Sequence, residues 1–154
     1  SSQTKFKFLK RETKKMKHDF TTKTNYVIHE HVADRAGPHY DLRIKRLKGG
    51  LLESWALPKL RFPQTYGERL LAIRTKPHSR LWLYFEGEIE EGYGKGSVRI
   101  VQKGEAIILK WDSKHIVFRI DGPVATGKFA LIKFEPKGGS KKTDTWMLIK
   151  LKEI

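Results

Sequence analysis

The 154-residue sequence contains no cysteine, which excludes a disulfide framework and any metal site built on thiolates. It shows no apolar run near the roughly 20 residues of a membrane-spanning helix and no amphipathic helix long enough to lie in a membrane surface, and we expect no signal peptide. A bound metal would therefore need nitrogen and oxygen ligands. We expect an intracellular, cytoplasmic protein with no membrane partner.

Acidic residues are scarce, since 17 Asp and Glu stand against 32 Lys and Arg, which gives a formal charge of +15. This balance favours a polyanionic partner, nucleic acid above all, and such a partner would place the protein at the nucleoid. Residues 1–25 are interpreted as a basic arm, which is either a solvated, partly disordered tail or a segment that orders on contact with the phosphate backbone. The length fits one further domain, expected over 26–154 as a monomer.

Helical periodicity over three turns is missing, and short apolar or alternating runs recur between Gly, Pro and Asp-Ser breakers. The expected fold class is all-β, an antiparallel barrel or sandwich with little helix. Residues 75–79 are expected to form a loop, and 90–96 a glycine-rich turn without the ending of a phosphate-binding P-loop. The expected strands are 26–31, 39–44, 51–57, 69–74, 81–89, 97–103, 106–111, 115–121, 128–134 and 145–151.

Chemistry-bearing side chains are concentrated in residues 29–43, which hold three of the six histidines. On a strand, His39, Asp41 and Arg43 share one face. A turn at Gly37-Pro38 would pair this strand with the preceding one and bring His31 to His39 and Asp41. Two imidazoles and a carboxylate suit a divalent transition metal, although ordinary surface histidines are the alternative. Arg43 favours a site if a phosphate lies beside it, because its planar fork binds that anion bidentately.

With these elements in place, the chain resembles the 3′-phosphoesterase domain of bacterial ligase D, the end-joining DNA repair ligase, and its stand-alone homologues. The resemblance runs from about Tyr26 to the C-terminus and depends on several motifs in order. They are residues 26–31 (Tyr-Val-Ile-His-Glu-His), 39–43 (His-Tyr-Asp-Leu-Arg), 54–59 (Ser-Trp-Ala-Leu-Pro-Lys), 69–73 (Arg-Leu-Leu-Ala-Ile), His78, 85–87 (Phe-Glu-Gly), 89–96 (Ile-Glu-Glu-Gly-Tyr-Gly-Lys-Gly) and 146–150 (Trp-Met-Leu-Ile-Lys).

The resemblance implies a small β-barrel hydrolase that uses Mn²⁺, or another divalent transition metal, to heal DNA 3′ ends. Family members remove a 3′-terminal ribonucleotide and then the 3′-phosphate, leaving a 3′-hydroxyl for repair by non-homologous end joining. A DNA ligase or polymerase is the implied partner. By the same resemblance, His31, His39 and Asp41 correspond to the metal ligands, and Arg43 and His78 to the groups that hold the scissile phosphate.

Two further basic residues, Lys59 and Arg69, match family positions near the groove. Trp82 stands where the family has an active-site tyrosine. Because indole has no oxygen and donates only through its ring nitrogen, a hydroxyl contact to phosphate is lost or changed. The expectation of phosphate removal, the monoesterase step, is therefore weaker than that of ribonucleotide removal.

Two other functions compete with this hypothesis. His39, Asp41 and a distant His78 imitate the facial triad of non-haem iron oxygenases. A non-catalytic barrel could instead bind nucleic-acid ends through aromatic side chains, namely Trp82, Tyr84 and Tyr93. No role is predicted for His18 or His115, whereas His29 shares a face with His31 and could orient a ligand.

Overall fold

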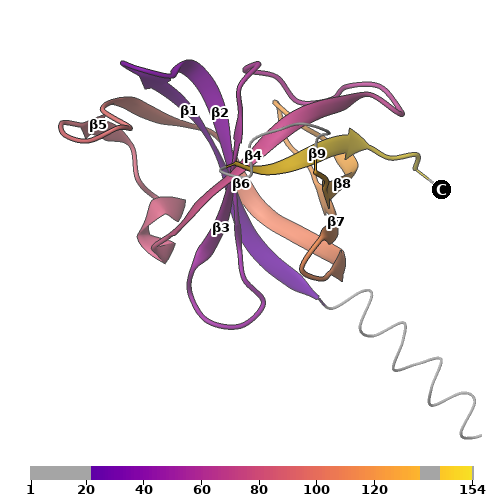
Figure 1. Cartoon of the computed structure of the whole chain (residues 1–154). Helices are drawn as coiled ribbons and strands as arrows, with labels where there is room; N and C mark the ends of the chain where they lie inside the picture. The colour runs from indigo at the N-terminus through magenta and orange to yellow at the C-terminus, as the bar shows by residue number, and fades with distance from the viewer. Residues whose placement is uncertain (1–21, 136–142, 154) are drawn as a thin grey trace, which may run out of the picture.

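Nine antiparallel strands and one short 3₁₀ helix make up the part of the chain that the computed structural model describes, residues 22–135 and 143–153 (Figure 1). In chain order they are β1 (Lys23–Ala33), β2 (Gly37–Lys45), β3 (Leu52–Leu57), β4 (Arg69–His78), the helix η1 (Arg80–Leu83), β5 (Gly87–Ile89), β6 (Gly96–Trp111), β7 (His115–Ile120), β8 (Gly127–Lys133) and β9 (Asp144–Lys150).

Eight of the strands close into a barrel. The hydrogen-bonded order is β1-β2-β3-β4-β9-β8-β7-β6, and β6 pairs back onto β1 along most of its length. The short strand β5 pairs with the beginning of β6, at the opposite end from β7, and therefore extends the sheet away from the closed ring (Figure 1). The prediction of an all-β antiparallel barrel is confirmed.

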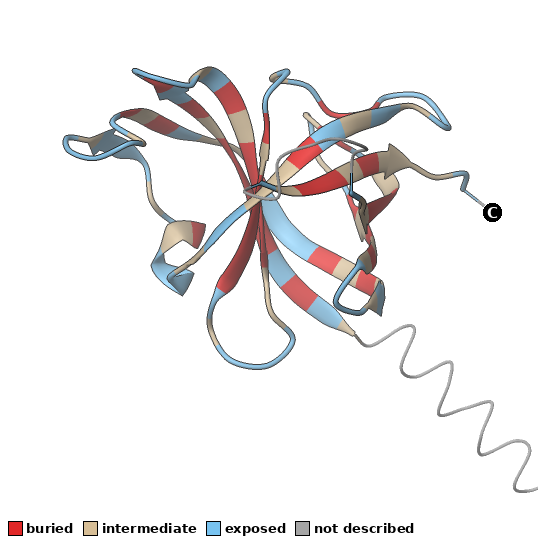
Figure 2. Cartoon of the chain, viewed as in Figure 1, coloured by how far each residue is buried: buried red, intermediate tan, exposed pale blue. Residues whose placement is uncertain are grey.

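Buried residues alternate with more exposed ones along several strands (Figure 2), and the inward-facing set forms the hydrophobic core. In β1 and β2 the alternate, outward-facing set is also buried, because η1 and the segment after it cover this part of the barrel surface. The largest fully buried core side chains are Trp55, Trp146, Tyr26, Phe62, Phe118 and Phe129. The covered outer face of β1, β2 and β3 is where the polar cluster lies.

The strand predicted at 81–89 is wrong over 81–86, where the covering helix η1 and a short irregular segment take its place, whereas 87–89 form β5. The Ser79 hydroxyl accepts a hydrogen bond from the Leu81 amide at 3.2 Å and caps the helix. Leu83 is buried against Val27 and Leu52, and its neighbour Trp82 packs on the same small cluster. Adjacent residues of a strand point to opposite faces, so a strand could not have placed both side chains on the barrel.

Three other boundaries differ from the sequence-based expectation. Gly104 does not separate two strands, because it lies inside the single long strand β6. Its φ of +154° is one that glycine adopts readily. Residues 75–78 continue β4 instead of forming a loop. Gly37 and Pro38 belong to β2, paired with the end of β1, so the turn falls at residues 34–36.

The predicted basic arm, 1–25, lies largely outside the described residues, and its last three residues belong to β1, which begins at Lys23. Within the described ranges, no helix has the length and apolar character needed to cross a membrane.

Candidate active site

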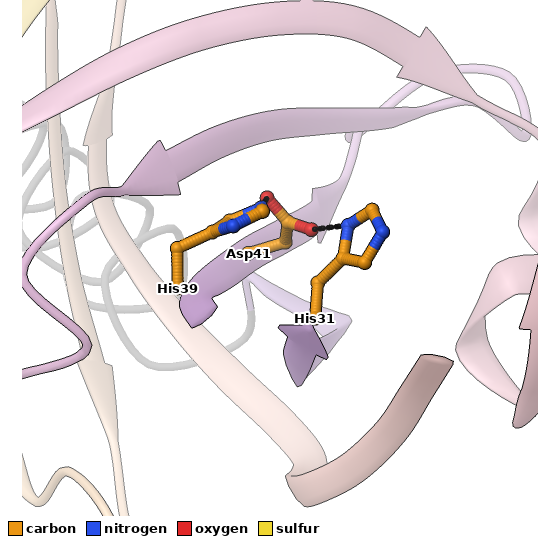
Figure 3. A group of neighbouring side chains, drawn as sticks. All are labelled: His31, His39 and Asp41. Carbon is orange, nitrogen blue, oxygen red and sulfur yellow. Dashed lines mark hydrogen bonds and ion pairs between the residues drawn. The ribbon is translucent and has the colours of Figure 1, made fainter. Parts of the chain in front are cut away.

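The pairing of β1 with β2 brings the three predicted ligands together. His31 lies opposite His39 in the ladder, and His29 lies opposite Asp41. The Asp41 carboxylate sits between the two imidazoles (Figure 3), with Oδ2 at 3.2 Å from His31 Nδ1 and Oδ1 at 3.3 Å from His39 Nε2. One ligand atom from each residue lies within 4.8 Å of the others. These three residues could hold a metal ion.

Backbone carbonyls fix which nitrogen of each imidazole faces the carboxylate. His31 Nε2 lies 2.6 Å from the Gly94 oxygen, and His39 Nδ1 lies 3.0 Å from the Gly37 oxygen. Since a carbonyl can only accept, both of these nitrogens carry hydrogen. In a neutral imidazole, the other nitrogen then points its lone pair toward the Asp41 carboxylate. The lone pair and the carboxylate repel each other unless a proton or a cation lies between them. The donor set therefore fits a cation, with the outer nitrogens anchored as in metal-binding histidines.

The pKa values of the cluster reflect a carboxylate surrounded by positive partners. Burial opposes ionisation of Asp41, but hydrogen bonds from His31 and His39 and the charge of Arg43 outweigh it and hold the Asp41 pKa far below its usual range. Burial likewise disfavours protonated His39, yet its hydrogen bond to Asp41 outweighs this and raises the His39 pKa. Asp41 is therefore an anion at neutral pH, ready to neutralise a cation.

Arg43 lies beside this carboxylate and is only 3% exposed. Its Nη2 donates to Asp41 Oδ2 at 3.3 Å, and its Nε donates to His29 Nδ1 at 3.3 Å. Burial lowers the Arg43 pKa, which Asp41 partly offsets, but a guanidinium remains a cation in proteins. Its charge is thus held in one orientation at the edge of the triad.

His29 holds Arg43 from the other side. It is fully buried, its Nε2 donates to the Phe85 carbonyl at 3.0 Å, and its Nδ1 accepts from Arg43. Burial, aided by the nearby Arg43 charge, lowers the His29 pKa to about 4. A neutral His29 therefore positions the guanidinium, whereas the sequence only suggested that it could orient a ligand. The signal was its shared face with His31.

His78 reaches the cluster from the end of β4. Its Nδ1 lies 2.7 Å from the Lys76 carbonyl, 3.2 Å from Arg43 Nη1 and 3.4 Å from Ser54 Oγ. The shortest contact identifies Nδ1 as the donor to Lys76, so Nε2 is left to meet a ligand. Burial and the Arg43 charge lower the His78 pKa. The structure thus brings His78 to Arg43, although not as one of the three converging ligands.

Trp82 covers Arg43 and His78. The Arg43 Cζ lies 4.9 Å from the centroid of the Trp82 ring, and the imidazole of His78 meets the indole edge to face at 4.8 Å. The ring of Phe85 packs against the indole at 4.7 Å. Trp82 therefore stabilises the guanidinium by a cation–π contact and shields it from water.

Three predicted or considered residues within the described ranges, Lys59, Arg69 and His115, are not joined to this cluster. Lys59 follows β3 and Arg69 begins β4. Both are exposed, and neither side chain forms a hydrogen bond or ion pair with a described residue. Their substrate-binding role stays a prediction. His115 begins β7, and His18 lies outside the described residues. An oxygenase would need His78 beside His39 and Asp41, but the group that converges in the described ranges contains His31 instead.

Sequence reasoning missed the two backbone carbonyls, of Gly94 and Phe85, that fix His31 and His29.

No curated protein matches the chain. The family model described as the DNA ligase D 3′-phosphoesterase domain matches residues 29–133, a span that covers more than half of the sequence and includes every residue of the cluster. The chain therefore belongs to the family of DNA ligase D 3′-phosphoesterase domains.

Proposed function

We propose that this protein is a metal-dependent phosphoesterase that removes a 3′-terminal ribonucleotide, and more slowly a 3′-phosphate, from DNA ends. Family membership supports a 3′-phosphoesterase role in DNA-end processing. The observation that carries the finer proposal is the convergence of two anchored imidazoles and one carboxylate beside a buried guanidinium. Mn²⁺ or a similar divalent transition metal suits this donor set.

His31 Nδ1, His39 Nε2 and Asp41 would hold the metal, which supplies Lewis acidity to a phosphate oxygen when bound. The carbonyls of Gly94 and Gly37 keep the two imidazoles in the tautomer that leaves these nitrogens free. Asp41 also pairs with Arg43, so the same carboxylate fixes the position of the guanidinium relative to the ligand nitrogens.

Arg43 would bind the phosphate through Nη1. Its Nε and Nη2 already donate to His29 and Asp41, whereas Nη1 has no acceptor when His78 donates to Lys76. Negative charge that develops on the phosphate oxygens therefore meets a donor that is already oriented, which lowers the barrier without reorganisation.

His78 is the titratable group placed to supply a proton. When water attacks phosphorus, a new P–O bond forms, the bond to the leaving oxygen breaks, and that oxygen takes up a proton. The His78 pKa is lowered in the free protein, but a phosphate anion opposite its Nε2 would raise it again. Protonation of His78 would thus accompany substrate binding, with the leaving oxygen as the acceptor.

Trp82 explains the expected difference between the two steps. A tyrosine here would offer a hydroxyl to the phosphate, whereas the indole packs on Arg43 and His78. A terminal phosphate dianion carries more charge than a diester and loses more from one missing donor. Removal of a ribonucleotide should therefore be the faster reaction.

The test uses a 5′-labelled DNA primer that ends in one ribonucleotide or in a 3′-phosphate, incubated with the protein and Mn²⁺. We expect cleavage of both ends, faster for the ribonucleotide, and no cleavage in EDTA. His39→Ala and Asp41→Ala should abolish cleavage and retain DNA binding, because binding is spread over many basic residues. His115→Ala, a histidine outside the cluster, is the matched control and should keep full activity. Cleavage that persists in EDTA, or equal loss of binding in the triad variants, contradicts the proposal.

A 3′-hydroxyl is the end that a polymerase extends and a ligase seals. We therefore place this reaction before one of these enzymes, in the intracellular repair of DNA ends.

A further inference from the structure

The loop that anchors His31 also presents an exposed tyrosine. Residues 92–95 form a tight turn, closed by the Lys95 amide donating to the Gly92 carbonyl at 3.2 Å. This turn is tied to the β1–β2 turn, since the Asp34 amide donates to the Lys95 carbonyl at 2.8 Å. Gly94 accepts from His31 within the same turn. Its neighbour Tyr93 is therefore held one residue from a carbonyl that touches the metal centre.

Tyr93 has no packing role that explains its position. Its side chain is 71% exposed, and the Cζ of Arg35 lies 5.8 Å from its ring centroid. Arg35 is exposed and makes no ion pair with any described residue. An exposed aromatic ring beside an unpaired guanidinium is the combination that binds single-stranded nucleic acid, the ring by base stacking and the cation by phosphate contact.

The two sides of the cluster are bordered by different side chains. On the Arg43 side, Trp82 and Phe85 close over a guanidinium that is 3% exposed. On the triad side, His31 leads directly to the exposed pair formed by Tyr93 and Arg35. A strand whose terminal phosphate lies against Arg43 would leave the site on this side.

We infer that Tyr93 and Arg35 form a subsite for the nucleotide on the 5′ side of the scissile phosphate, with the base stacked on the free face of Tyr93 and its phosphate near Arg35. This inference rests on the proposed function for its direction along the strand. The subsite binds single-stranded DNA at the 3′ end of the primer.

A second exposed pair provides a matched comparison. Tyr84 follows η1 and is 68% exposed, and the Nζ of Lys103 lies 5.5 Å from its ring centroid. Lys103 pairs with Val27, whereas the metal ligand His31 pairs with Val98. The second pair therefore lies toward the other end of the β1–β6 ladder. It has the same chemistry and a similar exposure, but it lies beside η1 and away from His31.

The experiment measures KM and kcat of the full chain, with Mn²⁺, on primers ending in a ribonucleotide or a 3′-phosphate. Tyr93→Ala should raise KM by roughly tenfold to a hundredfold, as expected for loss of one base stack, with kcat little changed. Both substrates should be affected equally, because they share the nucleotide on the 5′ side. Tyr93→Trp should restore KM, and Tyr84→Ala should leave it unchanged. Affinity for Mn²⁺ should be the same in all variants, which excludes an effect through Gly94 and His31.

Binding of the same primers in EDTA, followed by fluorescence anisotropy, separates this inference from the proposed function. If the wild type does not cleave but Tyr93→Ala weakens binding and Tyr84→Ala does not, the subsite stands and the hydrolase fails. If the wild type cleaves and Tyr93→Ala has the wild-type KM, the subsite is wrong. A rise in KM with Tyr84→Ala alone would place the strand on the other side and also overturn it, as would an effect confined to the ribonucleotide substrate.

Discussion

His29 should make the metal-free protein less stable in mild acid. Its side chain is fully buried and its pKa falls from 6.5 to about 4. A group whose native pKa is lowered binds protons more readily in the unfolded state, so its contribution to stability is complete above pH 6.5 and is lost as the pH falls toward 4. At 1.36 kcal/mol per pKa unit, the full contribution is roughly 3 kcal/mol, of which roughly 2 kcal/mol is lost between pH 7 and pH 5.

The variant that isolates this contribution is His29→Gln. A glutamine amide can donate to the Phe85 carbonyl and accept from Arg43, as His29 does, but it does not titrate in this range. Urea unfolding in EDTA at pH 7 and pH 5 gives the free energy of unfolding for both proteins. The loss on acidification should be about 2 kcal/mol smaller in the variant than in the wild type.

Comparison of the two losses is necessary because other groups titrate in the same interval. His78 has a lowered pKa and His39 a raised one, so their contributions have opposite signs and are common to both proteins. Equal losses in wild type and variant would mean that His29 carries a proton in the native protein, and the assignment of His29 as a neutral support for Arg43 would be wrong.

Two further substitutions test the support of the site. Gly94→Ala would place a Cβ 3.3 Å from His31 Cε1, so the imidazole must shift by a few tenths of an ångström. We therefore expect the affinity for Mn²⁺, measured by calorimetric titration, to fall about tenfold. An unchanged affinity would show that the loop shifts and the imidazole does not. Arg43→Lys keeps the charge but loses the planar guanidinium that Asp41 and His29 orient. We expect kcat for ribonucleotide removal to drop about a hundredfold, with primer binding in EDTA unchanged. A wild-type kcat would show that catalysis does not depend on an oriented guanidinium.

The triad could be predicted from the sequence because strand alternation is a local property. His39, Asp41 and Arg43 share a face wherever the strand begins, and an antiparallel partner of matching parity places His31 beside them. The prediction therefore survived a wrong position for the turn, which the structure places at 34–36 and not at Gly37-Pro38.

The supporting contacts could not be predicted in the same way. The carbonyls of Gly94 and Phe85 are backbone atoms, which every residue type offers, and their positions depend on how the segment after η1 folds over the barrel. Residues 81–86 were themselves mispredicted, because their aromatic and aliphatic side chains suit a strand as well as a capped turn. For His78 the family resemblance indicated a role, but the sequence did not show how the residue would reach the site. The structure shows that the extension of β4 carries His78 to Arg43.

The polar cluster also constrains the barrel that carries it. A one-residue slip of β2 against β1 would turn Asp41 and Arg43 into the hydrophobic core and move Leu42 out of it. Each charge placed there without a partner costs several kcal/mol, whereas in the observed register both are buried together and paired. The residues that form the site on one face of β2 therefore fix the register that packs the core on the other face. For this reason we expect a large apolar residue at position 41, as in Asp41→Leu, to disturb the β1–β2 pairing as well as the candidate metal site, whereas the small side chain of Asp41→Ala should not drive such a slip.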